Sequence, residues 1–169
     1  MPGSFFDTNV LLYAASADRA KADRAEQLIG EGGAISVQVL NEIANVARRK
    51  MGLSWTETHA FLDMIRGLLP VHPITIEIHE AGLSLAERYG LSLYDAMIAA
   101  SALHADCDTL WSEVMQNRMV IEGRLRVVNP FRTGGFEESA TFDVAWNASL
   151  SDTMTEWNNE DENVYNDLA

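Results

Sequence analysis

The sequence is poor in cysteine, in long apolar runs and in basic residues, and each shortage narrows what the protein can be. Its single cysteine, Cys107, excludes an internal disulfide framework and is typical of the reducing cytosol. No apolar run reaches the roughly 18 residues that span a bilayer, and no basic stretch precedes an apolar one. We therefore expect a cytoplasmic protein with neither a membrane span nor a secretory signal.

Basic residues number twelve against 25 acids, but the two kinds are unevenly distributed. Residues 133–169 contain nine acids and no Lys or Arg. The net charge of −13 is therefore largely a property of this extension and does not exclude a nucleic-acid partner for the rest. The length and the 47% apolar content predict one sizeable core. We expect one domain over residues 1–132, followed by an acidic extension over residues 133–169.

Short apolar stretches alternate with longer helical patterns along the first 132 residues. Strands or extended segments are predicted at 3–6, 34–36, 71–74, 109–111 and 126–128. Helices are predicted at 9–16, 18–29, 37–50, 54–69, 75–89 and 92–104, with N-caps at Ser36, Ser54, Thr75 and Ser92. This alternation predicts an α/β fold with a mainly parallel, buried sheet, whose functional crevice lies at the carboxyl ends of the strands.

The stretch FFDTN, residues 5–9, ends an apolar strand in three polar residues. A carboxylate at the edge of a core is costly to desolvate unless something neutralises it. One interpretation is helix capping, with Thr8 or Asn9 as the N-cap and Asp7 near the positive end of the helix. The other is that Asp7 forms one corner of a cation site. This stretch alone leaves both interpretations open.

Two further acids stand where apolar residues are expected. Glu42 lies within the inward-facing apolar stripe of helix 37–50; the alternative is a place on the flank of that stripe beside a basic neighbour. Asp95 is the only carboxylate of LSLYDAMIAASALHA, residues 91–105, a helix apolar on all sides. Its position three residues after Ser92 also suits an acid near a helix N-terminus.

Asp7, Glu42 and Asp95 would repel one another if the fold brought them together. Either their pKa values would rise, or a divalent cation would keep them ionised. Oxygen ligands without Cys or His at metal-binding spacing favour Mg²⁺ or Mn²⁺ over zinc. We interpret all four histidines as structural or exposed; these are His59, His72, His79 and His104.

Five segments spread over residues 3–131 read FFDTNVLLY, VLNEIANVARRK, LSLYDAMIAASAL, CDTLWSE and RVVNPF. In this order and spacing they resemble a PIN-domain ribonuclease, and most closely the VapC-type toxins of prokaryotic toxin–antitoxin pairs. The resemblance implies a three-layer α/β fold with a mainly parallel sheet flanked by helices, in agreement with the pattern of elements. It also implies a cognate antitoxin and a homodimer as partners.

The resemblance further implies endonucleolytic cleavage of RNA assisted by Mg²⁺ or Mn²⁺. Asp7, Glu42 and Asp95 match the catalytic, metal-binding acids of the family, and Asn9 and Ser112 match supporting polar positions. In this chemistry the ion lowers the pKa of a bound water and neutralises charge on the phosphate.

The sequence departs from the family pattern after LWSE, where such toxins commonly carry a fourth acid and this chain has Val114. Valine cannot ligate a cation or hold a water, so we expect reduced or abolished activity. Glu113 is a further supporting candidate, although neighbouring side chains of an extended segment point in opposite directions. A second departure is Asn117-Arg118, where a turn-forming pair such as Asp-Gly is frequent.

RNA binding requires a basic surface, and four residues are candidates for phosphate contacts: Arg48, Arg49, Lys50 and Arg118. Ordinary solvated surface charge is the alternative for each of them.

The extension 133–169 combines its acids with five of the chain's fourteen aromatic residues. A disordered, solvated tail is one interpretation. The other is a segment that docks aromatic anchors on a basic surface. The stretch TEWNNEDENVYNDL is similar to the C-terminal ends of antitoxins, which implies an inhibitor carried by the chain itself.

The leading hypothesis is therefore a metal-dependent ribonuclease restrained by Val114 and by the extension. The alternative is a catalytically silent PIN fold that serves as a binding or assembly module. A receiver-like phosphoacceptor is disfavoured because the sequence lacks an adjacent acid pair and a well-placed late Lys. A dinucleotide enzyme is disfavoured because no G-x-G-x-x-G follows a strand.

Overall fold

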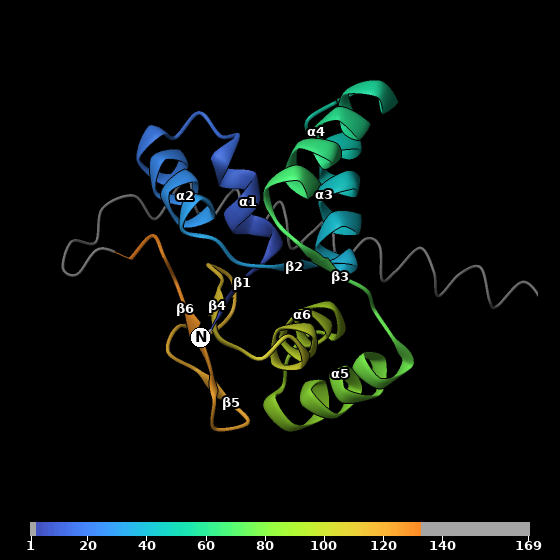
Figure 1. Cartoon of the computed structure of the whole chain (residues 1–169), viewed down its shortest axis with the longest axis vertical. Coiled ribbons are helices and arrows are strands. Elements are labelled where there is room, and N and C mark those ends of the chain that lie inside the picture. The colour runs from blue at the N-terminus through green and yellow to red at the C-terminus, as the bar shows by residue number, and fades with distance from the viewer. Residues whose placement is uncertain (1–2, 133–169) are drawn as a thin grey trace, which may run out of the picture. The chain divides into compact units, whose positions relative to one another are not determined.

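Helices and short strands alternate through residues 3–132, the part of the chain that the computed structural model describes (Figure 1). In order they are β1 (Gly3–Phe6), α1 (Thr8–Ala14), α2 (Arg19–Glu31), β2 (Ile35–Ser36), α3 (Val37–Arg49), α4 (Trp55–Leu68), β3 (Val71–His72), α5 (Ile76–Tyr89), α6 (Leu93–His104), β4 (Cys107–Trp111), β5 (Val120–Ile121) and β6 (Leu125–Val128). The predicted α/β alternation is confirmed. The extension 133–169 lies outside the described residues, as do the expectations placed on it.

The main sheet has the strand order β1-β4-β6-β5. β1 and β6 both run parallel to β4, whereas the two-residue β5 is antiparallel to β6 and was not predicted. β2 and β3 form a separate parallel pair, joined to β1 by a bridge between Phe5 and Ala34. The carboxyl ends of β1, β4 and β6 therefore share one edge, where the chain continues into Asp7 and Ser112.

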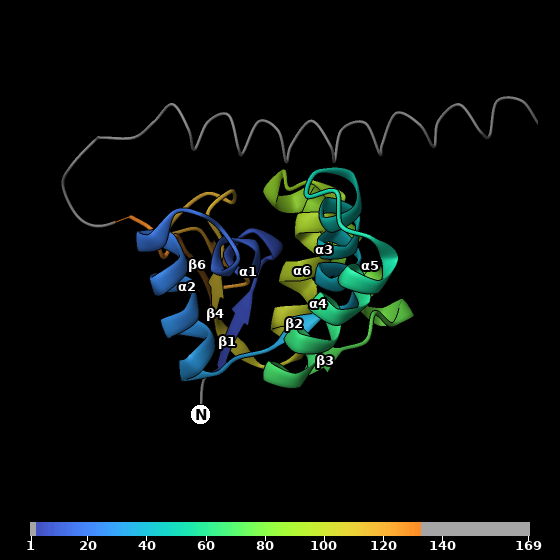
Figure 2. The same cartoon turned by 90° about the horizontal axis from the view of Figure 1, so that it is seen from above.

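Helices cover both sides of the strands. In Figure 2, α2 lies on one side of β1, β4 and β6, and α6 with α5 lies on the other. α6 packs against β4, β2 and β6 on one side and against α5 on the other. Its sequence explains this central position, because the residues from Ala96 to Ala102 are all buried and mostly small. This arrangement confirms the mainly parallel sheet flanked by helices.

Side-chain caps fix where several helices begin. Ser54 and Glu57 form the predicted capping box of α4, and the hydroxyl of Thr75 accepts a hydrogen bond from Ile78 N–H at the start of α5. Ser36 occupies the N-cap position of α3, as predicted, but makes no capping hydrogen bond. Its hydroxyl is buried without a hydrogen-bond partner among the described residues, so the N-cap position is confirmed and only the capping hydrogen bond is absent.

The turn between β4 and β5 holds Arg118 in the left-handed region, at φ 68°. Its backbone N–H donates to Val127 O at 2.8 Å, and the side-chain oxygen of Asn117 accepts from Asn129 N–H at 2.9 Å. A turn that needs positive φ accounts for the glycine frequent there in the family pattern. Within residues 3–132, no helix is both long and apolar enough to cross a membrane.

Candidate active site

Asp7 lies at the carboxyl end of β1 and is itself the N-cap of α1, so the prediction of Thr8 or Asn9 as the cap is wrong. The residue is only 2% exposed. Its Oδ1 accepts from Thr8 N–H at 2.7 Å, and its Oδ2 accepts from Asn9 Nδ2 at 3.0 Å and from Ser112 Oγ at 2.6 Å. These donors are neutral, and no ion pair to Asp7 occurs within residues 3–132.

Glu42 approaches the same edge from α3. Its Oε2 accepts from Thr8 Oγ1 at 2.5 Å, and its Oε1 accepts from Gln38 Nε2 at 3.0 Å. Thr8 therefore links the Asp7 turn to Glu42 across 34 residues of sequence. The basic neighbour offered as the alternative explanation for Glu42 is not its partner among the described residues; two neutral polar groups are.

Asp95 belongs to the first turn of α6, and its backbone N–H donates to Ser92 Oγ at 3.2 Å. The capping interpretation is thus correct for Ser92. It does not account for the carboxylate itself, because burial raises the pKa of Asp95 above its ordinary value, against the hydrogen bond from Ser92.

Electrostatics places the three acids in one region, the acid cluster of Asp7, Glu42 and Asp95. Burial, the charge of Asp95 and the charge of Glu42, in this order, raise the pKa of Asp7 to about 8. Burial also raises the pKa of Glu42 to about 7, with a smaller contribution from Asp95 and opposed by hydrogen bonds from Thr8 and Gln38. The contributions of one carboxyl group to the pKa of another require the two groups to lie close enough to repel each other.

The acid cluster fits a hard divalent cation by its chemistry. All its donors are carboxylate oxygens, and a cation at this edge would replace the protons that burial and repulsion favour. In the described part of the chain, however, no group of three or more His, Cys, Asp or Glu residues stands arranged as a metal site. Asp7 and Glu42 turn their oxygens toward Ser112, Asn9 and Thr8 instead.

The segment after β4 supplies Ser112 to the site but no acid. Ser112 is fully buried, and its Oγ, besides donating to Asp7, accepts from Met115 N–H at 3.1 Å. Glu113 turns away from Asp7: its Oε1 lies 2.8 Å from Lys21 Nζ. Val114 is 46% exposed. The carboxylate nearest in sequence to the missing fourth acid is therefore held by Lys21.

The four basic candidates lie in two places: three at the C-terminal end of α3 and one in the turn before β5. Arg48 donates a hydrogen bond to Leu53 O and lies 4.5 Å from the centre of the Trp55 ring, so it stabilises the turn that precedes α4. Arg49 is the last residue of α3 and is exposed, Lys50 is its C-cap, and Arg118 stands in the turn before β5.

Three residues that support the site were missed by the sequence analysis. Gln38 stands four residues before Glu42 on one helix face, a spacing that does mark hydrogen-bonded pairs. Thr8 follows Asp7 directly and was considered only as a cap. Lys21 carries no sequence signal for its contact with Glu113, because 92 residues separate the two.

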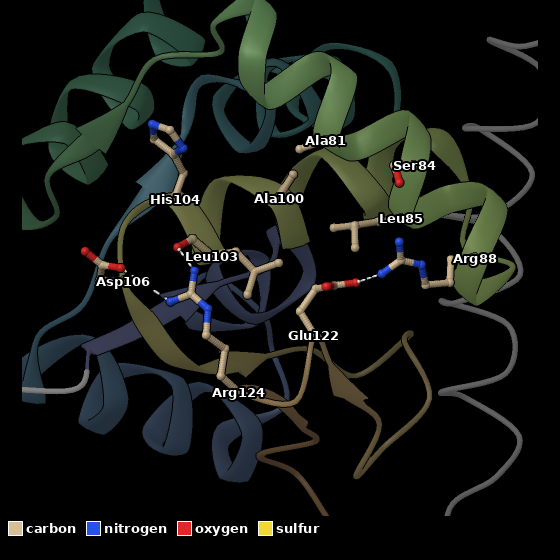
Figure 3. A pocket seen from close by; sticks show the side chains of 10 residues that line it. All are labelled: Ala81, Ser84, Leu85, Arg88, Ala100, Leu103, His104, Asp106, Glu122 and Arg124. Carbon is tan, nitrogen blue, oxygen red and sulfur yellow. Dashed lines mark hydrogen bonds and ion pairs between the residues drawn. The ribbon is translucent and has the colours of Figure 1, made fainter.

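A concave region lies away from the acid cluster, between α5, α6 and the turn joining β5 to β6 (Figure 3). Its volume is about 420 Å³. Its charged side chains pair within the pocket: Arg88 with Glu122, and Arg124 with Asp106 at 3.3 Å. We call it the paired pocket; none of the acid cluster lines it.

The fold and the acid cluster together define an α/β domain with carboxylates gathered at the carboxyl edge of a parallel sheet. The chain belongs to the PIN domain family, whose family model matches residues 4–119. Among curated proteins no relative matches.

Solved structures similar to this chain come from VapC-type toxin–antitoxin systems. A toxin–antitoxin complex from Klebsiella pneumoniae is 25% identical, covers 77% of this chain and 99% of its own, and has a TM-score of 0.59. VapBC2 from Rickettsia felis, bound to a promoter DNA fragment, is 20% identical over 73% of this chain and 96% of its own, with a TM-score of 0.55. Mycobacterium tuberculosis VapC20, a toxin that cleaves the sarcin–ricin loop, is 19% identical over 65% of this chain and 88% of its own, with a TM-score of 0.55.

Proposed function

We propose that this PIN domain is a Mg²⁺- or Mn²⁺-dependent endoribonuclease of the VapC toxin type, acting in the cytoplasm. The observation that carries the proposal is the acid cluster: three carboxyl groups with raised pKa values, two of them linked through Thr8, with no cationic partner among the described residues. A structural role would call for a Lys or Arg among them or for apolar replacements, because unpaired buried charge is costly.

Each residue has a defined part in this proposal. Asp7, Glu42 and Asp95 would hold the ion, which when bound supplies an activated water and neutralises charge on the phosphate. Ser112 and Asn9 orient Asp7 through hydrogen bonds of 2.6 and 3.0 Å. Exposed basic side chains such as Arg49 contact RNA phosphates and make binding sensitive to salt.

The decisive experiment is cleavage of a structured RNA by the purified full chain, with Mn²⁺ and with a chelator. Cleavage that requires Mn²⁺ and disappears in Asp7→Asn supports the proposal. The matched control is Asp63→Asn, which removes an exposed acid of α4 that pairs with Arg66, a similarly exposed side chain. Equal cleavage with chelator, or in Asp7→Asn, would remove the basis for a metal-dependent nuclease.

A catalytically silent PIN module is the second candidate, and one observation favours it. Val114 is exposed and Glu113 is held by Lys21, so the segment that would carry a fourth acid presents none to the cluster. The two candidates differ in one measurement: a silent module binds partners but cleaves no RNA at any Mn²⁺ concentration.

Inhibition by the extension 133–169, or by a separate antitoxin, completes the proposal. The support is compositional: the extension carries nine acids and five aromatics, whereas all twelve Lys and Arg residues precede it. An acidic segment competes with RNA for basic side chains. Deleting 133–169 should raise RNA affinity or Mn²⁺-dependent cleavage, and so should converting its acids to amides. If neither change has an effect, the extension is a spacer.

A homodimer is proposed as the working assembly. Its support is the large apolar side chains exposed on helices of the body, including Trp55, Leu68 and Ile76 at 60–69% exposure. Light scattering on the full chain tests this, and a monomer at micromolar concentration would contradict it.

A further inference from the structure

Lys21 and Glu113 form an ion pair that is buried although it joins two charged residues. Lys21 Nζ and Glu113 Oε1 lie 2.8 Å apart, and the two side chains are only 11% and 9% exposed. Lys21 belongs to α2, whereas Glu113 follows β4. Removing two charges from water costs several kcal/mol per ion, and such pairs contribute little net stability. A buried pair therefore calls for a reason other than stability.

The surroundings of Lys21 hold its ammonium in one place. Lys21 Nζ lies 3.2 Å from the hydroxyl of Tyr13 and 4.3 Å from the centre of that ring, with the Phe131 ring at 5.4 Å. Glu113 is less well satisfied, because its Oε2 is buried without a hydrogen-bond partner among the described residues. Among residues 3–132, Lys21 alone thus anchors the Glu113 carboxylate, through one oxygen.

Backbone and side-chain hydrogen bonds connect this pair to Asp7. Glu113 N–H donates to Asn9 Oδ1 at 3.1 Å, and Asn9 Nδ2 donates to Asp7 Oδ2 at 3.0 Å. The preceding residue, Ser112, donates to the same Oδ2 at 2.6 Å. Both donors to this oxygen are therefore fixed by the segment that Lys21 holds.

We propose that Lys21 and Glu113 are a positioning pair, which orients Asn9 and Ser112 and through them the Asp7 carboxylate for cation binding. The pair touches neither the ion nor the substrate. The pair connects α2 to the carboxyl edge of the sheet. It also explains why Glu113 does not replace the missing acid at Val114. The part concerning cations rests on the proposed function; the orientation of Asn9 does not.

Replacing both partners separates positioning from stability. In Lys21→Met/Glu113→Met the buried charges are gone, so thermal stability should equal or exceed that of the parent. Mn²⁺ affinity, measured by titration calorimetry, should nevertheless fall about tenfold or more, as expected when groups that orient metal ligands are lost. The conservative variant Lys21→Arg keeps the positive charge and should retain most of the parent's Mn²⁺ affinity. The matched control is Arg24→Met, which removes another basic side chain of α2, one that contacts Pro130 and Trp111 rather than Glu113.

A second readout needs no metal. In the metal-free full chain, amide hydrogen exchange at Glu113 should be at least about tenfold faster in Lys21→Met than in the parent or in Arg24→Met. The reason is that the hydrogen bond from Glu113 N–H to Asn9 Oδ1 opens more often. Unchanged exchange at Glu113, or parental Mn²⁺ affinity in the doubly apolar variant, would overturn the positioning pair. If the parent itself fails to bind Mn²⁺, the proposed function fails, and the exchange result still decides whether the pair positions Asn9.

Discussion

The acid cluster and the paired pocket contain similar charged residues in opposite arrangements. The cluster gathers Asp7, Glu42 and Asp95 around neutral donors, and their pKa values rise. In the paired pocket each acid has an arginine beside it, Glu122 with Arg88 and Asp106 with Arg124, and the partners lie largely in solvent.

The difference shows which region requires bound protons or a cation to compensate its charge. Exposed pairs of opposite charge neutralise each other and contribute little to stability. Like charges in a buried place are costly in every state except a protonated one or one bound to a cation. The paired pocket is therefore complete as it stands, and the acid cluster is not. Substitutions in the two regions test this contrast.

Removing the central acid of the cluster should separate function from stability. We expect Asp7→Asn to lower Mn²⁺-dependent cleavage on the order of a thousandfold or more, because the ion loses its most enclosed ligand. The same variant should be at least as stable as the parent above about pH 8, where Asp7 of the parent is ionised, because a buried charge is gone. Cleavage assays and thermal unfolding measure the two effects.

The matching substitution in the paired pocket is Glu122→Gln. It breaks the exposed pair with Arg88 and should cost no more than about 1 kcal/mol, with cleavage unchanged. A loss of cleavage in Glu122→Gln as large as in Asp7→Asn would erase the contrast between the two regions.

Adding an acid at position 114 should increase the activity of the acid cluster and leave the paired pocket unchanged. We expect Val114→Asp to raise Mn²⁺-dependent cleavage about tenfold or more, because a further oxygen ligand becomes available to the ion or its water. The exposed position of Val114 makes the change compatible with the fold. Val114→Asn, of the same shape but uncharged, is the control in the same assay. Equal rates for Val114→Asp and the parent would mean that position 114 does not limit the activity.

The cluster should also make stability depend on pH. In the folded protein Asp7 keeps its proton up to about pH 8 and Glu42 up to about pH 7, against ordinary values of 3.8 and 4.5. Between these limits the folded state binds more protons than the unfolded state, so stability is greatest at low pH and falls as pH rises through the window. Thermal unfolding in chelator at pH 5, 6, 7 and 8 measures the fall.

Mg²⁺ gives the counterpart of that experiment. At about a hundred times its dissociation constant, an ion that binds only the folded state adds about 2.7 kcal/mol. At one fixed Mg²⁺ concentration the gain should be larger at pH 8 than at pH 5, where protons compete for the same carboxylates. A chain whose stability rises from pH 5 to 8 in chelator would show that the acids are not crowded.

How far the sequence predicts this molecule differs between the fold and the site. Helix periodicity and caps such as Ser54 act over a few residues, so nearly all elements were predictable. β5 was not, because two residues carry too little pattern. Asp7, Glu42 and Asp95 each stood out as an acid among apolar neighbours, although their roles stay a proposal. The contact of Lys21 with Glu113 depends on how α2 packs beside β4, and no local pattern encodes it.

Backbone strain offers the smallest effect, and it allows a position outside the paired pocket to be compared with one inside it. Arg118, outside the paired pocket, has φ 68°, and Glu122, inside it, has φ 52°. Glycine tolerates this region without the steric cost that a side chain incurs. Arg118→Gly keeps the backbone bond to Val127 and should raise stability by about 0.5–1 kcal/mol, a few degrees in thermal unfolding.

Gln116→Gly is the control for Arg118→Gly, because Gln116 lies in the same turn without positive φ and gains only the flexibility of glycine. It should be neutral or destabilising. Glu122→Gly should fall between the two, since relief of strain is offset by loss of the ion pair with Arg88. If Arg118→Gly is no more stable than Gln116→Gly, the left-handed conformation at Arg118 carries no strain, and the arginine in this turn costs the fold nothing.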